Sequence, residues 1–240
     1  MTIQTVPFDS LGGENHGWLD AKHHFSFANY YDPKRMGVGP LRVWNDDTIQ
    51  PGTGFPFHPH RDMEIITFVR EGAITHEDSL GNKGRTEAGD VQVMSAGTGI
   101  VHSEYNLEDE ITRIFQIWII PDERGHKPRW DSRQFPKGSR AGELVALASG
   151  RDVHAGTEAL AIHADSAVLG ATIEAGKDVR HRLDEGRALY IVPAKGAVSV
   201  GDTFVDTRDG AVITAADEGE EVVIKADLDA EIVVVDVPLS

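Results

Sequence analysis

Short apolar runs separated by polar turns recur along the whole chain. Runs at residues 65–69, 113–120, 189–192 and 231–237 are rich in isoleucine and valine, and glycine, aspartate or asparagine lies between them. Segments of roughly four to eight residues with many β-branched side chains, bounded by turn residues, are typical of strands. No segment of helix length keeps a period of about 3.6 residues. The pattern therefore predicts an all-β protein made of sandwiches or barrels.

The chain also resembles itself. Residues 72–75 (Gly-Ala-Ile-Thr) match residues 196–199 (Gly-Ala-Val-Ser), and residues 107–111 match residues 228–232. A repeat of this length predicts two similar β-domains in tandem. We place the first domain at residues 1–125 and the second at residues 143–240. The polar stretch 126–142, rich in Arg, Lys, Pro and Gly, is the expected linker.

Two pairs of residues point to a metal site. His58 and His60 stand two residues apart in one predicted strand, and His102 and Glu104 have the same spacing in another. Side chains two residues apart project from the same face of a strand. If both strands line one barrel, three imidazoles and one carboxylate converge, which is a ligand set for a divalent transition metal. A lone histidine is more often structural, and Pro59 is compatible with an exposed turn, but the repeated spacing favours metal binding.

The internal repeat indicates that only the first domain binds metal. It aligns the four candidate ligands with Arg182, Asp184, Val223 and Lys225. His181 falls one residue out of this alignment, and a shift of one residue turns a strand side chain to the opposite face. We therefore expect no metal site in the second domain.

Composition bears on partners and compartment. With 39 acidic and 23 basic residues the net charge is -16, so direct binding to nucleic acid is not expected. The chain has no cysteine, so any metal must be held by nitrogen and oxygen ligands. We see neither an apolar run of about 18 residues nor a signal-peptide pattern, and expect a cytoplasmic protein without a membrane span. The acidic run 217–221 is expected to form a solvated turn.

Glycines surround the candidate ligands in a regular order. Residues 52–72 read G-x5-H-x-H-x3-E-x7-G, and residues 89–106 read G-x7-G-x-G-x2-H-x3-N. Glycine permits the tight turns that set strand register. These motifs resemble those of the cupin superfamily, with small departures such as Gly97 where proline is usual. The common cupin ligand set would take Glu64 as its carboxylate, whereas Glu104 has the right spacing from His102, so the spacing leaves both open.

Residues 17–33, 57–61, 73–78 and 95–104 resemble the pirin family. The resemblance covers about the first 120 residues; the second half matches mainly in length and β character. It implies a bicupin, two tandem antiparallel β-barrels of the jelly-roll type. It also implies that the metal ligands are His58, His60, His102 and Glu104, with Glu64 beside the site but not bound to the metal.

The resemblance implies a chemistry as well. Three neutral imidazoles and one carboxylate leave a divalent ion open to further ligands. Iron(II) is the metal that the family suggests, and manganese, nickel, cobalt, copper or zinc also suits these ligands. Some pirin relatives cleave the flavonol quercetin with O2 and release carbon monoxide. The leading hypothesis is this 2,3-dioxygenation, with Glu104 as the catalytic base. Residues expected in or behind the pocket are Glu64, Phe55, Phe57 and the segment 23–27, in particular His23 and Phe25.

Other functions stay open. Pirin-like proteins also act without catalysis, when the redox state of iron alters a surface that docks onto a regulatory protein. The acidic surface would then meet a basic partner. A third hypothesis is another metalloenzyme, since cupin sites host many chemistries. His76 is expected to order a loop with Glu77 or Asp78. The second domain is expected either to cover the first barrel or to exchange a terminal strand with it.

Overall fold

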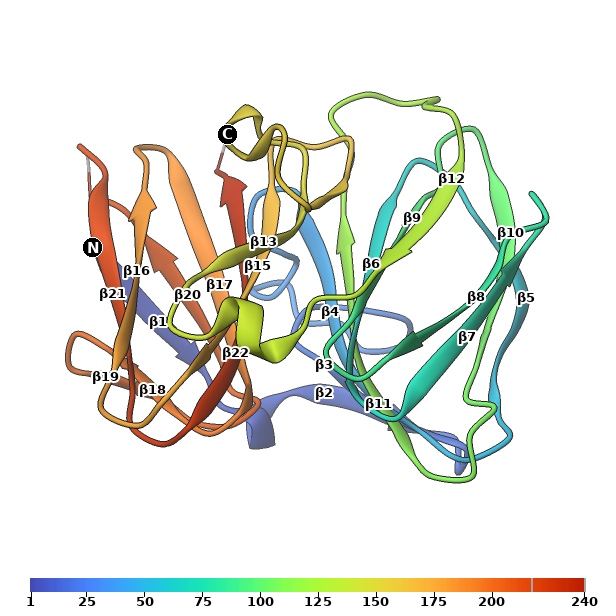
Figure 1. The fold of residues 1–240 in the computed structure, drawn as a ribbon, viewed down its shortest axis with the longest axis horizontal. Coiled ribbons are helices and arrows are strands. Elements are labelled where there is room, and N and C mark those ends of the chain that lie inside the picture. The colour runs from blue at the N-terminus through green and yellow to red at the C-terminus, as the bar shows by residue number, and fades with distance from the viewer. Residues whose placement is uncertain (217, 240) are drawn as a thin grey trace.

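The computed structural model describes residues 1–216 and 218–239, so Asp217, part of the predicted acidic turn, and Ser240 lie outside the described residues. Figure 1 shows two β-rich halves side by side. Each half contains a seven-stranded and a four-stranded sheet, which confirms the predicted all-β fold of two cupin-type domains. In the described part of the chain, no helix is long and apolar enough to cross a membrane. The short 3-10 helices are η1 (Phe8–Ser10), η2 (Lys137–Arg140) and η3 (Asp152–His154).

The first domain holds the candidate ligands, in the half coloured mainly blue to green. Its seven-stranded sheet has the order β12 (Arg129–Arg133), β9 (Val91–Ser95), β6 (Glu64–Glu71), β11 (Thr112–Ile119), β4 (Leu41–Ile49), β3 (Leu19–His23) and β2 (Gly12–Asn15). Its four-stranded sheet has the order β5 (Gly54–His60), β10 (Ile100–Tyr105), β7 (Ala73–Asp78) and β8 (Lys83–Glu87). All these neighbours pair antiparallel, as expected for jelly-roll barrels.

The second domain repeats this arrangement. Its seven-stranded sheet has the order β1 (Thr2–Val6), β20 (Gly210–Thr214), β17 (Arg187–Lys195), β22 (Ala230–Pro238), β15 (Ala167–Ile173), β13 (Val145–Ser149) and β14 (Leu160–Ala161). Its four-stranded sheet has the order β16 (Asp178–Leu183), β21 (Glu220–Ala226), β18 (Val198–Val200) and β19 (Thr203–Val205). Gly72 and Gly196, which the internal repeat aligns, have the same backbone conformation, with φ angles of 73° and 70°.

A hydrophobic core is shared between the two domains. Trp44, Phe68 and Phe115 of the first domain belong to the same buried cluster as Tyr190 and Val233 of the second. The rings of Trp44 and Tyr190 lie 5.5 Å apart. Burial of each such side chain contributes about 1.5–3 kcal/mol. The second domain therefore covers the first, and the two pack as one body.

The predicted domain boundaries differ from the structure at both ends. Strand β1, in the expected first domain, pairs with β20 of the second, with Ile3 opposite Ile213. Strand β12 lies inside the expected linker 126–142 and pairs with β9, with Trp130 opposite Met94. Both are edge strands, where polar and charged residues are tolerated. Their polar composition therefore did not identify β1 as a strand of the second domain or β12 as a strand of the first.

In the second barrel, the residues that correspond to the candidate ligands lie one position away from those that the internal repeat predicted. His181 pairs with Val222 as His58 pairs with His102. Val222 is fully buried, whereas its neighbour Val223 is only partly buried. His181 therefore occupies the position of His58 and faces the interior, and the prediction that it points to the other face is wrong.

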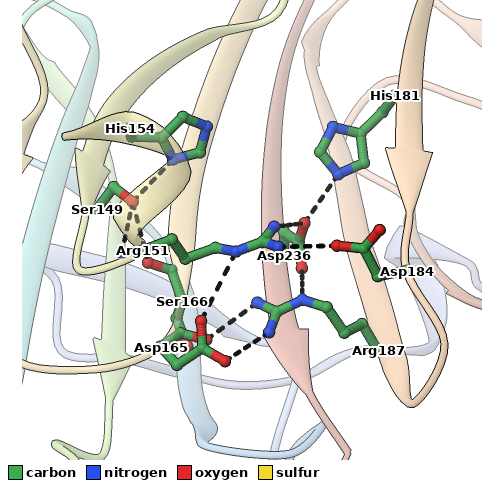
Figure 2. A network of polar contacts seen from close by, with 9 residues as sticks. All are labelled: Ser149, Arg151, His154, Asp165, Ser166, His181, Asp184, Arg187 and Asp236. Atoms are coloured by element: carbon green, nitrogen blue, oxygen red, sulfur yellow. Dashed lines mark hydrogen bonds and ion pairs between the residues drawn. The ribbon is translucent and has the colours of Figure 1, made fainter. Parts of the chain in front are cut away.

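An ionic network surrounds His181 in the second barrel, as Figure 2 shows. The buried carboxylate of Asp236 accepts hydrogen bonds from Arg151 Nη1 (2.5 Å), His181 Nε2 (2.8 Å) and Arg187 Nε (2.6 Å). Arg187 Nη1 also lies 2.7 Å from Asp165. Both groups of potential metal ligands found among residues 1–216 and 218–239 lie in the first domain.

Candidate metal centre

Three of the predicted ligands meet on neighbouring strands of the first domain. Strand β5 lies beside β10, and His58 is directly opposite His102. The ring centroids lie 4.5 Å apart for His58 and His102, 4.8 Å for His58 and His60, and 5.0 Å for His60 and His102. One potential ligand nitrogen from each histidine lies within 4.8 Å of the others. The structure thus brings these three imidazoles together, as the strand spacing predicted.

His60 and His102 are in the protonation state that a metal requires. Burial, followed by the neighbouring His102 and His58, lowers the pKa of His60 to about 4. Burial, followed by His58 and His76, lowers the pKa of His102 to about 3. Both rings are therefore neutral near pH 7, and a neutral imidazole has a lone pair for a metal.

Two ring nitrogens are left free to face such an ion. His58 Nδ1 lies 2.7 Å from the Pro56 carbonyl oxygen and can only donate to it, so Nε2 is the nitrogen of this ring that can offer a lone pair. His102 Nε2 is buried and has no hydrogen-bond partner among the residues that the structure describes. A buried polar atom without a partner is costly. A divalent ion bound between the rings would satisfy it, so the donor set fits a metal.

Glu104 lies beside the histidines but is held by the protein. It forms a second group of potential ligands with His102 and His76, and the four predicted ligands do not form one group. Its carboxylate accepts hydrogen bonds from three side chains: Thr67 (3.1 Å), Gln92 (2.5 Å) and Gln116 (2.8 Å). These donors orient the carboxylate and stabilise its negative charge. Coordination of the metal by Glu104 stays a prediction.

A cavity of about 330 Å³ opens onto the site. His58, His60, His102 and Glu104 all line it. The rest of its wall combines apolar and polar side chains: Phe27, Phe55, Pro56, Ile65, Trp118, Asn45, Asp47 and Gln116. A mostly apolar cavity with a few convergent polar groups is typical of a small-molecule site.

A β-bulge decides which phenylalanine of β5 faces this cavity. His102 pairs with His58, but Glu104 pairs with Phe55, so β5 has one extra residue between them. A bulge reverses the alternation of side chains. Phe55 therefore lines the cavity, whereas Phe57 is 58% exposed and does not, which corrects the expectation for Phe57.

Three other predicted pocket residues lie behind the cavity or away from it. His23 is buried one layer back, where Nδ1 contacts Asn45 Oδ1 at 2.8 Å. Phe25 packs against Tyr190 in the core shared by the domains, with ring centroids 5.0 Å apart. Glu64 is buried beside β9, where it accepts a hydrogen bond from Ser95 Oγ at 2.7 Å. None of the three lines the cavity, although Phe27, from the same predicted segment as Phe25, does.

Sequence reasoning missed the polar contribution of β4. Asn45, Asp46 and Asp47 are consecutive and all buried, and the first and third line the cavity. Burial, followed by the charges of Asp46 and Glu104, raises the pKa of Asp47 well above its usual range, which favours the protonated form of this carboxyl. The signal was present, since three polar residues in the middle of an apolar strand need a buried function or partner.

Comparison with known proteins finds relatives that match both halves of the chain. Residues 5–119 match the Pirin family model, and residues 147–237 match the model described as the quercetinase C-terminal cupin domain. A pirin-like protein of Caulobacter vibrioides is 60% identical over 234 residues, which cover 98% of this chain and 99% of that protein. A quercetin 2,3-dioxygenase of Escherichia coli is 43% identical over 228 residues, 95% of each chain.

A solved structure supports the metal. The bacterial pirin YhhW from Escherichia coli, in complex with nickel(II), superposes with a TM-score of 0.91 at 40% identity over 100% of both chains. This complex and the cluster of histidines together support a site for a divalent metal. Because both of its halves match and its relatives match over nearly their whole length, the chain belongs to the pirin family.

Proposed function

We propose that this protein is a metal-dependent oxygenase of the quercetin 2,3-dioxygenase type, with His58, His60, His102 and Glu104 as the ligands of one divalent ion. The observation that carries the proposal is that three clustered imidazoles and the carboxylate of Glu104 line one mostly apolar cavity. Relatives named quercetin 2,3-dioxygenase support it. In this reaction one flavonol and one O2 give one ring-opened ester and one carbon monoxide, so the atoms balance.

Iron(II) is the metal that we propose first, on the family resemblance. Nickel(II) is the ion in the structure of a relative, and manganese, cobalt, copper or zinc also suits nitrogen and oxygen ligands. When bound, the ion supplies a positive charge that favours the deprotonated 3-hydroxyl of a flavonol.

Glu104 is the residue that we propose to take the proton of the 3-hydroxyl. A carboxylate offers about four acceptor positions. Thr67 and Gln92 donate to Oε1, and Gln116 donates to Oε2. One position on Oε2 is therefore free of protein donors, and the metal and the substrate proton would take it in turn. The same donors would hold the carboxylate in place while the proton is transferred.

Asp47 complements this base on the cavity wall. Its carboxyl is 3% exposed, and Oδ1 has no hydrogen-bond partner among the described residues. In the protonated form, which its burial favours, this carboxyl would donate a hydrogen bond to a carbonyl or phenolic oxygen of the substrate. A flavonol has several such oxygens on a flat apolar skeleton, which suits the aromatic side chains of Phe27, Phe55 and Trp118.

The proposal is tested by supplying quercetin under air to protein loaded anaerobically with Fe(II), with detection of carbon monoxide. We expect release of carbon monoxide by the wild type and by His16→Ala, since the side chain of His16 is 51% exposed and pairs only with Glu14 among the described residues. His58→Ala should lose both the bound metal and carbon monoxide. No release from the fully metal-loaded wild type, with iron or any other tested metal, would overturn the proposal. It would favour a regulatory partner instead.

A further inference from the structure

A buried chain of hydrogen bonds leads from Asp78 through His76 to His102. His76 Nε2 lies 3.0 Å from Asp78 Oδ2, and His76 Nδ1 lies 3.3 Å from His102 Nδ1. His76 is fully buried, and Asp78 and His102 are 6% and 2% exposed. Strands β7 and β10 form this chain, because their register places His102 opposite Asp78 and His76 opposite Glu104.

The contacts of Asp78 define where the protons lie. Its Oδ1 accepts the backbone N–H groups of Leu80 (2.8 Å) and Asn82 (3.1 Å), and its Oδ2 accepts the side-chain amide of Asn82 (2.9 Å). A carboxylate surrounded by donors acts as an acceptor, so His76 Nε2 carries a hydrogen. With one hydrogen on the His76 ring, at Nε2, the lone pair is at Nδ1, and His102 Nδ1 donates to it. The lone pair of His102 is left on Nε2, the atom without a partner among the described residues.

Packing holds His76 in the orientation that this chain needs. The indole of Trp130 stacks on the His76 ring, with centroids 4.9 Å apart and planes 8° apart. Gly84 is paired with His76 across β7 and β8, and a Cβ at Gly84 would lie 2.2 Å from the indole of Trp130. The glycine therefore makes room for the ring that covers His76.

We infer that Asp78 and His76 are positioning residues that set the tautomer of His102, so that its Nε2 lone pair faces the metal. The inference rests on the proposed function only in taking His102 as a metal ligand. The hydrogen bond at one imidazole nitrogen decides which nitrogen is free for a metal. Partners of this kind are worth about 10–100-fold in metal affinity. His76 is thus more than the loop-ordering residue that the sequence predicted.

Asp78→Asn tests the inference by reversing the chain. Oδ1 must stay an oxygen to accept two backbone N–H groups, so the new amide nitrogen takes the place of Oδ2 and donates to His76 Nε2. The side-chain amide of Asn82, which donates to Oδ2 in the wild type, would turn over so that its oxygen accepts the second hydrogen of this nitrogen. His76 then carries its hydrogen on Nδ1 and donates to His102, which must move its own hydrogen to Nε2. We expect nickel(II) affinity, measured against a competing chelator, to fall by about 10–100-fold. Asp90→Asn is the matched control, since Asp90 accepts the Phe135 N–H at 3.0 Å in a loop of the same domain.

The tautomers themselves are read by nitrogen NMR of the ring in the metal-free protein. We expect wild-type His102 to carry its hydrogen on Nδ1 and His76 on Nε2, and we expect both to switch in Asp78→Asn. Wild-type His102 with its hydrogen on Nε2 would overturn the inference, even if the variant fails to fold. So would an Asp78→Asn protein with unchanged tautomers and wild-type nickel affinity. Neither measurement needs turnover, so a failure of the proposed oxygenase activity would be separate.

Discussion

Replacing Asp236 with asparagine should lower the free energy of unfolding by about 3–5 kcal/mol, the usual cost of removing one partner from a buried ionic network. Asp236 is fully buried and accepts hydrogen bonds from Arg151, Arg187 and His181. The side chains of Arg151 and Arg187 are only 9% and 8% exposed. Asparagine keeps the shape but turns an N–H donor toward donors, and it leaves two buried cations without their shared anion.

The other carboxylates of the network compensate poorly. Asp165 and Asp184, which also contact these arginines, have side chains 64% and 56% exposed, where water screens an ion pair. For a chain of this size, about 1 kcal/mol corresponds to roughly 2–4 °C, so the melting temperature should fall by roughly 6–20 °C. Circular dichroism or calorimetry of the metal-free protein measures this shift.

The contribution of this network to stability should also decrease at low pH. Burial alone would raise the pKa of Asp236, but hydrogen bonds from His181 and Arg187 and the charges of both arginines outweigh it, and the pKa is lowered. A lowered carboxylate pKa contributes stability above the unfolded value of about 3.9, and this stability is lost as the pH falls through the folded pKa. The stability of Asp236→Asn should therefore not show this decrease at low pH.

The matched control is Glu221→Gln. Glu221 pairs with Arg180 on the surface of the same domain, where the side chains are 54% and 59% exposed. Water screens this pair, so the melting temperature should not change measurably. A melting temperature of Asp236→Asn equal to that of this control would refute the reasoning.

Three further predictions follow from the cavity and the strands. Asp47→Leu should lower kcat/KM for quercetin by about tenfold, because one hydrogen bond to the substrate is lost. Asp47→Asn keeps a donor, so its kcat/KM should stay near that of the wild type. Equal kcat/KM values for Asp47→Leu and the wild type would contradict the proposed role. Lowering the pH from 7 to 5 should destabilise the metal-free protein in urea by up to about 1.4 kcal/mol per pH unit for each of the partly buried His60 and the buried His102. These rings stay neutral when folded, with pKa values of about 4 and about 3, but gain a proton below about pH 6.5 when unfolded. A flat profile would exclude their burial as neutral rings. Deleting β1 should lower the free energy of unfolding by roughly 1–5 kcal/mol, because five residues of β1 pair with β20 and each cross-strand pair contributes about 0.2–1 kcal/mol. Thermal unfolding measures this loss, and an unchanged melting temperature would show that the edge strand is dispensable.

Much of the fold followed from local patterns. Apolar runs bounded by glycine predicted strands, and the internal repeat predicted two domains of the same architecture. The shared face of His58 and His60, and that of His102 and Glu104, was predictable as well, whereas the approach of His58 to His102 followed only if both strands lined one barrel. Strand side chains repeat every second residue, and the glycine-rich turns on either side set the register of β5 and β10. These properties depend on neighbours in sequence.

The positions that the sequence did not decide depend on pairing between distant segments. One extra residue in β5 turned Phe55 inward, and a shift of one position placed His181 inside the second barrel. The place of β1 depended on which sheet had an open edge. Asp47 and His76 became candidates only when β4 and β7 were seen beside the histidines. Residue spacing determines which side chains share a face of one strand, whereas the partner across the sheet is set by tertiary packing.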